Sequence, residues 1–241
     1  MAIVSLGLCA ASAAARPRLL ITTESSPPSA MMGERQVIGF ATEKIRGIME
    51  RVGIDYDIDM LPWKRAYLLA QSQQDTCVYS TTRVPDRESL FKWIGPTHEN
   101  DWTLFGRADR NYRITSIEDA RKYRIGTYNG DVRSDALIAQ GFLVDTVQDK
   151  LANPRKLLVN RIDLWASSVR VGNAIVAENG WGGQIVPVLT FKRTELYLAC
   201  NRSVPDALVA KMNAALRAMN SEGVSAAIER KYNYVGTSAS R

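Results

Sequence analysis

The stretch that decides the fold is TTRVPDR at residues 81–87, followed by FKWIGP at residues 91–96. It comes directly after TCVYS at residues 76–80, an apolar run that predicts a β-strand. Hydroxyl and backbone N–H groups therefore stand at a strand end, with Arg87 shortly after Thr82. A planar guanidinium can hold both oxygens of a carboxylate at once. Taken alone, the stretch still favours a solvated loop with a surface arginine.

The rest of the chain alternates predicted strands and helices, which is typical of parallel sheets covered by helices. Residues 18–23 (RLLITT) predict the first strand, and residues 41–52 have the apolar spacing of a helix that Gly53 ends. Further strands are predicted at 54–60, 102–106, 123–128, 161–166, 185–189 and 196–201, and further helices at 62–70, 116–121, 135–140, 151–158, 172–178, 205–219 and 223–231. The pattern restarts near residue 100, so we expect two α/β units with a cleft between them.

Composition excludes several classes of protein. The chain has 241 residues, 46% of them hydrophobic and 23% charged, as expected of a folded soluble protein. Its net charge is +6, but the basic residues are scattered, so we expect no nucleic-acid partner. His98 is the only histidine and no Gly-x-Ser-x-Gly elbow accompanies it. We therefore expect no catalytic residue, no metal site and no cofactor.

Residues 1–15 differ from the rest of the chain. They carry no charge, contain a short apolar run and end in AAA before Arg16, which predicts the end of a secretory signal peptide removed near Ala15. The run is far shorter than the roughly 20 residues of a membrane span. Export makes disulfides possible, and loss of Cys9 would leave Cys77 and Cys200. The residues alone leave open whether these two are bonded or are buried free thiols.

Several short motifs follow one another in a definite order: GF at 39–40, PWKRA at 62–66, Thr82 with Arg87, WIGP at 93–96, YRIG at 123–126, NRID at 160–163, YLA at 197–199 and RKY at 230–232. With them, residues 16–241 resemble the extracellular solute-binding proteins of family 3, the polar amino-acid-type receptors of bacterial ABC transporters. The resemblance implies an α/β, two-lobe periplasmic binding protein-like fold (type II), with two hinge strands and a ligand cleft between the lobes.

The resemblance also implies the lobe boundaries. Lobe one would comprise residues 16–101 and 198–241, and lobe two residues 102–197 with the hinge strands at its ends. In the family topology the return strand lies beside the third strand, which would bring Cys200 next to Cys77 and favour a disulfide between them.

The function that the resemblance implies is reception of a solute without any covalent step. A monomeric periplasmic protein would trap a small carboxylate-bearing, amino-acid-like solute by lobe closure and deliver it to an ABC permease in the inner membrane. Two alternatives stay open. One is an enzyme on the same scaffold, similar to cyclohexadienyl dehydratase, and the other is a receptor that presents its ligand-bound form to a sensor.

The resemblance assigns candidate ligand-binding residues in lobe one. Arg87 matches the family arginine that holds a ligand carboxylate, Thr82 matches an assisting hydroxyl, and Ser80 matches a backbone contact beside it. Trp63 matches an apolar side chain that covers the ligand, and Glu24 follows the first strand in a loop facing the cleft. Each of these roles has a structural alternative. Thr82 and Ser80 could simply cap a strand end, Trp63 could pack in the core, and Glu24 could be a solvated loop acid.

In lobe two the sequence departs from the family. Asp131 stands where relatives often place hydroxyls, and Arg133 would compensate as an anion-binding group. Ser168 stands where relatives that bind α-amino acids usually place an aspartate for the ammonium group. A buried ammonium without a counter-charge is costly. Either the ligand is not a standard α-amino acid, or Asp131 or Glu24 supplies the charge.

Overall fold

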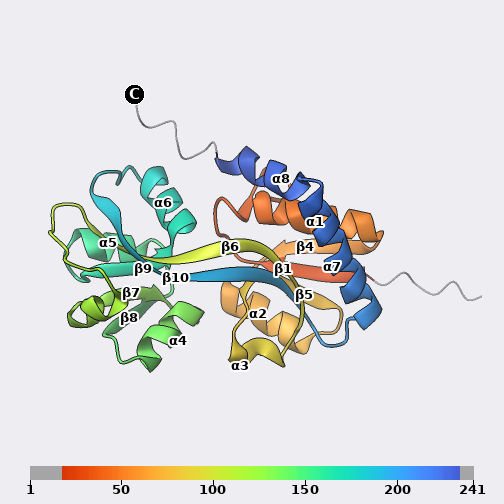
Figure 1. Ribbon diagram of the computed structural model, residues 1–241, viewed down its shortest axis with the longest axis horizontal. Coiled ribbons are helices and arrows are strands. Elements are labelled where there is room, and N and C mark those ends of the chain that lie inside the picture. Colours follow the sequence, from red (N-terminus) through yellow and green to blue (C-terminus); the bar gives the residue numbers. More distant parts are fainter. Residues whose placement is uncertain (1–17, 234–241) are drawn as a thin grey trace, which may run out of the picture.

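The structure is a computed structural model, and it describes residues 18–233 of the chain. The predicted signal peptide, residues 1–15, lies outside the described residues. Figure 1 shows two halves, each with helices packed around strands, and two long strands that connect them. We call the half that holds β1 lobe one and the half that holds β9 lobe two. Across residues 18–233, no helix combines the length and the apolarity needed to cross a membrane.

Lobe one has a parallel three-stranded core sheet in which β1 pairs with β4 on one side and β5 on the other. Its elements are β1 (Arg18–Thr23), β2 (Met31–Met32), β3 (Val37–Ile38), α1 (Phe40–Val52), β4 (Asp55–Met60), α2 (Trp63–Ser72), β5 (Thr76–Thr82), α3 (Pro85–Glu88), α7 (Asp206–Ser221) and α8 (Val224–Asn233). Helices α1, α7 and α8 lie on one face of the sheet and α2 on the other (Figure 1).

The sequence pattern explains the first helix. Apolar side chains three and four residues apart put Ile45, Ile48 and Met49 on one buried stripe against the sheet. The helix ends at Gly53, which adopts the left-handed conformation with φ of 70°. Glycine takes this conformation without the steric cost of a Cβ atom. The predicted end of this helix is confirmed.

Lobe two repeats the arrangement with a second parallel group, in which β7 pairs with β8 and with β9. Its elements are η1, a 3₁₀ helix (Ile117–Lys122), β7 (Ile125–Tyr128), α4 (Val132–Ala139), β8 (Val144–Val147), α5 (Ala152–Leu158), β9 (Leu164–Ser168) and α6 (Val169–Glu178). Buried Ile125 and Leu164 pack on one side of these strands, and buried Phe105 and Trp165 on the other. Each lobe therefore has its own apolar core.

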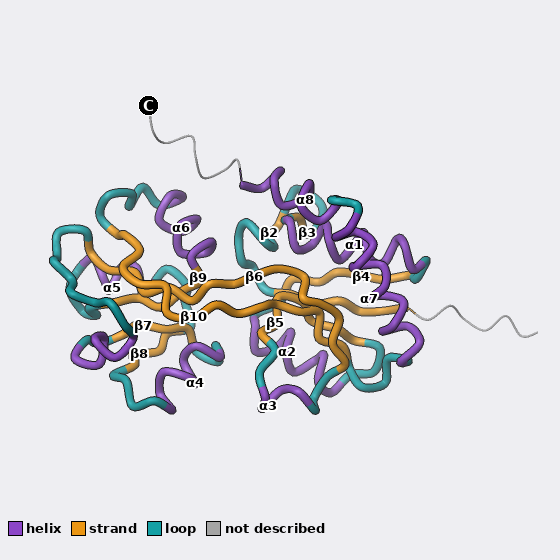
Figure 2. Tube along the Cα trace, in the orientation of Figure 1, coloured by secondary structure: helices purple, strands orange, loops and turns teal. Residues whose placement is uncertain are grey.

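Two long strands, β6 (Lys92–Arg107) and β10 (Ile185–Cys200), join the lobes. They pair with each other antiparallel, from Cys200 opposite Lys92 to Ile185 opposite Arg107. They also occupy the centre of one eight-stranded sheet with the order β4-β1-β5-β10-β6-β9-β7-β8. Figure 2 shows both strands passing from one half of the molecule to the other.

The structure corrects the predicted limits of several strands. The strands predicted at 185–189 and 196–201 are parts of one strand, because the mostly polar and exposed segment between them, residues 190–195, also pairs with β6. The strand predicted at 161–166 lies at Leu164–Ser168 instead. The helix predicted at 135–140 begins at Val132, since the Asp131 side chain caps it. Short β8 has two adjacent polar residues between two valines, which lacks the alternation of a strand, and it was not predicted.

Cys77 and Cys200 form a disulfide, as the resemblance implied. They lie opposite each other in the antiparallel pairing of β5 with β10, and both are fully buried in the core of lobe one. The bond links positions 123 residues apart in the sequence. It therefore fixes the end of the second connecting strand to the central sheet of lobe one.

We predict that the double substitution Cys77→Ala/Cys200→Ala lowers the free energy of unfolding by about 2–4 kcal/mol, because a long loop in the unfolded chain is no longer closed. Urea denaturation of the variant and of the wild type measures this difference. Wild type treated with a thiol reductant is the control and should lose a similar amount. Equal stability of the oxidised wild type and the variant would contradict the prediction.

Candidate functional site

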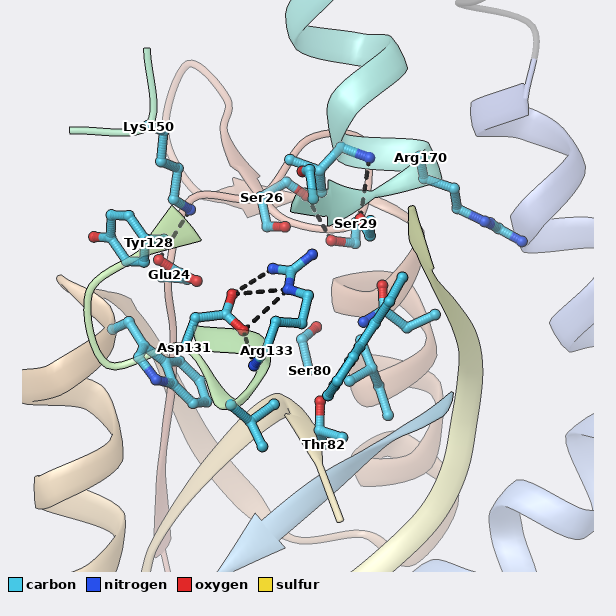
Figure 3. A pocket seen from close by; sticks show the side chains of 18 of the residues that line it. Glu24, Ser26, Ser29, Ser80, Thr82, Tyr128, Asp131, Arg133, Lys150 and Arg170 are labelled. Atoms are coloured by element: carbon cyan, nitrogen blue, oxygen red, sulfur yellow. Dashed lines mark hydrogen bonds and ion pairs between the residues drawn. The ribbon is translucent and has the colours of Figure 1, made fainter. Parts of the chain in front are cut away.

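A cleft lies between the lobes and encloses about 1080 Å³ of atom-free space, including its open mouth. Both lobes contribute to its walls, as Figure 3 shows. The eight candidate residues from the sequence all line it: Glu24, Trp63, Ser80, Thr82, Arg87, Asp131, Arg133 and Ser168. The fold therefore brings them together at one place, and their roles in binding remain predictions.

Arg87 lies on the lobe-one wall, in the short helix α3 that follows strand β5. Its guanidinium carbon stands 4.9 Å from the centre of the Tyr67 ring. An aromatic face attracts and orients a guanidinium, and this contact leaves the N–H groups of the guanidinium unused. The half-buried Arg87 side chain donates no hydrogen bond to another residue within the described part of the chain. Its donors thus remain available to an anion in the cleft.

Ser80 has an unusual backbone near the end of β5. Its φ is 59°, a left-handed value that non-glycine residues rarely adopt. The pairing of β5 with β10 shifts register at this point, between Tyr197 and Ala199 of β10. Such a bulge turns a side chain away from its usual direction. The Ser80 hydroxyl is buried beside the cleft and has no hydrogen-bond partner among residues 18–233.

Asp131 and Arg133 form a close ion pair on the lobe-two wall (Figure 3). Asp131 Oδ1 accepts from the Arg133 backbone N–H at 2.8 Å and from Nε at 3.0 Å, while Oδ2 accepts from Nη2. The two side chains are only 16% and 17% exposed. Burial acts to raise the pKa of the Asp131 carboxyl, but Arg133 outweighs burial and holds that pKa below its ordinary value. Asp131 is therefore ionised and already paired.

Ser168 ends β9 and caps helix α6. Its hydroxyl oxygen accepts a hydrogen bond from the Val171 backbone N–H at 3.2 Å, and the residue is 5% exposed. The serine thus satisfies one of the free N–H groups at the start of the helix. It reaches the cleft as a neutral hydroxyl, with no charge to offer a ligand.

Two contacts between residues that line the cleft join the lobes. The Lys150 ammonium lies 2.9 Å from the Glu24 carboxylate and also donates to the Ser25 carbonyl. The Trp63 indole N–H donates to the Gly130 carbonyl at 3.2 Å. Burial raises the pKa of Glu24, with Lys150 acting in the opposite direction. Glu24 and Trp63 therefore contact lobe two directly in this structure.

A third contact joins α6 of lobe two to lobe one. Arg170 of α6 places its guanidinium 5.0 Å from the centre of the Phe40 ring and lies 3.3 Å from the Glu229 carboxylate of α8. Lys44, only 3% exposed, holds the other oxygen of Glu229 at 2.5 Å. This cluster connects the first helix, the last helix and lobe two.

His98 lies next to that cluster and lines the cleft. It is buried, packs edge-on against Phe40 and shares a 3.1 Å hydrogen bond between Nδ1 and the Thr97 hydroxyl. Burial, together with the nearby charges of Lys44 and Arg170, lowers the pKa of His98 to about 3. The imidazole is therefore neutral at physiological pH and packs against Phe40 without a charge.

Sequence reasoning did not single out Lys150, Arg170, His98 or Tyr128 as site residues. Lys150 lies in the loop between β8 and α5, where no pattern marks a functional side chain. Arg170 comes two residues after Ser168, the last residue of β9. This position just after a strand end could have marked Arg170 as a candidate site residue. Contacts across the cleft depend on how the lobes meet, which no local pattern encodes.

The comparisons with known proteins agree with this geometry. Residues 19–235 match the family described as bacterial extracellular solute-binding proteins, family 3. The chain belongs to this family. The resemblance inferred from the motifs is thereby confirmed. A search of curated proteins found no match.

Solved structures of similar fold include a histidine kinase sensor domain with similarity to periplasmic binding proteins, at TM-score 0.82 and 17% identity over 90% of this chain and 96% of that one. An ancestral arginine-binding protein bound to glutamine matches at TM-score 0.77 and 22% identity, over 90% of this chain and 98% of that one. The arginine-, lysine-, histidine-binding protein ArtJ from Geobacillus stearothermophilus matches at TM-score 0.77 and 16% identity, over 89% of this chain and 94% of that one. These similarities confirm the predicted periplasmic binding protein-like α/β fold.

We predict that His98 makes this solute-binding protein sensitive to acid. A His98 pKa of about 3 lies below its ordinary 6.5, so the unfolded chain takes up this proton first as the pH falls. Stability should therefore drop between about pH 6.5 and pH 3, by up to about 1.4 kcal/mol per pH unit. Urea denaturation at several pH values should show a smaller drop for His98→Gln. Parallel pH profiles for the two proteins would contradict the assignment.

We predict that Lys150→Ala loosens the contact between the lobes, because the Glu24 carboxylate loses its partner. The matched control is Lys156→Ala, which breaks a pair with Asp145 inside lobe two at the same 2.9 Å. A partly exposed pair is worth about 0.2–1 kcal/mol, so the ratio of open to closed forms should rise up to about fivefold. Small-angle X-ray scattering should give a larger radius of gyration for Lys150→Ala only. Equal radii of gyration for the two variants would contradict this prediction.

Proposed function

We propose that this protein is a periplasmic receptor that binds a small carboxylate-bearing, amino-acid-like solute and delivers it to an ABC permease in the inner membrane. The observation that carries the proposal is Arg87, which lies on one wall of an inter-lobe cleft with its guanidinium oriented by Tyr67. Membership of the solute-binding family supports the proposal, as do structural relatives bound to arginine or glutamine.

Lobe closure is the proposed working step. In this proposal Arg87, Thr82 and Ser80 hold the solute from lobe one, and Arg133 and Ser168 hold it from lobe two. A solute that contacts both walls favours the closed form by its extra affinity for that form. We place the hinges at residues 101–102 and 197–198, within the two long connecting strands. We further propose an exported monomer that needs no cofactor.

A second candidate is a receptor that signals instead of feeding a permease. The similarity in fold to a histidine kinase sensor domain, at TM-score 0.82, favours this candidate. Cells that lack the protein would distinguish the two. Lost uptake of the bound solute indicates transport, whereas intact uptake with a lost response to the solute indicates sensing.

We propose that the protein has no enzymatic activity. General acid catalysis, as a dehydratase requires, needs a protonated carboxyl group within reach of the substrate. Asp131 has a lowered pKa and is bound to Arg133. Glu24 has a raised pKa, but its carboxylate is bound to Lys150 between the lobes. Neither acid is placed to donate a proton freely.

We predict that Arg87→Ala weakens binding of the solute at least about 30-fold, a loss of roughly 2 kcal/mol or more, because a charged hydrogen-bonding partner disappears. Isothermal titration calorimetry against a panel of amino acids and organic acids gives the affinities. The matched control is Arg83→Ala, four residues earlier in the chain, whose guanidinium pairs with Glu88 outside the cleft. Unchanged affinity in Arg87→Ala would overturn the site assignment.

A further inference from the structure

The carboxylates of the cleft decide which solutes it can hold. Three of them line it: Glu24, Glu99 and Asp131. An ammonium group taken from water needs one of them as a counter-charge. Whether any of the three is free to serve follows from its contacts and its exposure.

The Asp131 carboxylate already has a cationic partner, Arg133. Both of its carboxylate oxygens accept hydrogen bonds from Arg133, and its side chain also caps α4 through the Arg133 backbone N–H. An ammonium group at this carboxylate would have to replace a buried guanidinium that makes several hydrogen bonds. The exchange would leave that guanidinium without its counter-charge inside the cleft, which is costly.

Glu24 and Glu99 are no better placed than Asp131 to serve as the counter-charge of an ammonium group. Glu24 is bound to Lys150, so an ammonium group that took this carboxylate would break a contact that joins the two lobes. Closure and ammonium binding would then oppose each other. Glu99 is exposed at the rim on β6, where water screens its charge. Among residues 18–233, no carboxylate that lines the cleft itself is thus both buried and unpaired. Asp101, whose Oδ1 is buried without a hydrogen-bond partner, lines a separate small pocket beside the cleft.

The unpartnered buried atoms of the cleft are mostly donors. Among residues 18–233, the buried side-chain nitrogens that line the cleft without a hydrogen-bond partner are Arg133 Nη1, Arg170 Nη1 and Trp102 Nε1. The Ser80 hydroxyl is also unpartnered, and the one unpartnered acceptor there is the uncharged Asn153 Oδ1. Buried donors without partners are matched by the oxygens of an anion.

We propose that this cleft selects a small organic acid that carries no ammonium group, with its acid groups held by Arg87 of lobe one and Arg133 of lobe two. This inference rests on the proposed function and narrows the class of solute. The neutral hydroxyl of Ser168, which already caps α6, agrees with it. An α-amino acid would bring a positive charge into a site whose buried acids are already neutralised.

The test compares matched pairs of compounds that differ by the amino group. Calorimetric titration of the wild-type protein uses succinate against L-aspartate, glutarate against L-glutamate, and 3-phenylpropanoate against L-phenylalanine. For the pair that fits the cleft, we expect the amine-free acid to bind about tenfold or more tightly than its amino acid, because the ammonium lacks a counter-charge.

The substitution Arg133→Gln sharpens the test. It removes the lobe-two donor and leaves the Asp131 carboxylate free to meet an ammonium group. The ratio of affinities should then shift toward the amino acid by about tenfold or more. The matched control is Arg155→Gln, an exposed arginine of lobe two that does not line the cleft, and it should leave the ratio unchanged.

The outcomes separate the two proposals. Amino acids that bind as tightly as their amine-free partners would overturn this inference and leave the proposed function standing. An Arg133→Gln protein with the wild-type ratio would also overturn it. If no compound of the panel binds, the molecule extracted from natively purified protein is identified by mass spectrometry. An extracted amine overturns the inference, an amine-free acid supports it, and a molecule without any acid group overturns the proposed function as well.

Discussion

The structure depends on the antiparallel pairing of β6 with β10. These two strands are the only part of the described chain that belongs to both lobes, and their hydrogen bonds continue from Cys200 opposite Lys92 to Ile185 opposite Arg107. The disulfide between Cys77 and Cys200 fixes one end of the pair in the core of lobe one. Each wall of the cleft is therefore attached to a sheet that these two strands continue into both lobes.

The charges of the cleft follow from this placement. Strand ends from both lobes meet there, and their side chains neutralise one another before any solute arrives. Arg133 holds Asp131 within lobe two, whereas Lys150 holds Glu24 across the two lobes. The first pair lies within one lobe, and the second is a direct contact between the two lobes. Arg87 lies outside both pairs, which is why it carries the proposal for binding.

Much of the fold was predictable because local patterns and packing agree. The apolar stripe and terminal Gly53 defined the first helix, and the ordered motifs identified the family. The eight candidate residues lie around one cleft because parallel strands place their carboxyl ends at the same edge. The continuous strand β10 was not predictable, since its middle crosses between lobes and lacks the alternation of a half-buried strand. The left-handed backbone of Ser80 was equally hidden, because it results from a register shift against β10.

The sequence by itself determined the family, the two-lobe α/β fold and the position of Arg87 after a strand end, because all three depend on order and spacing along the chain. It also showed that Ser168 lacks the charge that an amino-acid ligand would require, but it left Asp131 and Glu24 as substitutes. Only the tertiary structure shows which groups these two acids contact. The partners of both acids, Arg133 and Lys150, are chosen by distance in space, and a carboxylate that already holds a buried cation is no longer free to hold another.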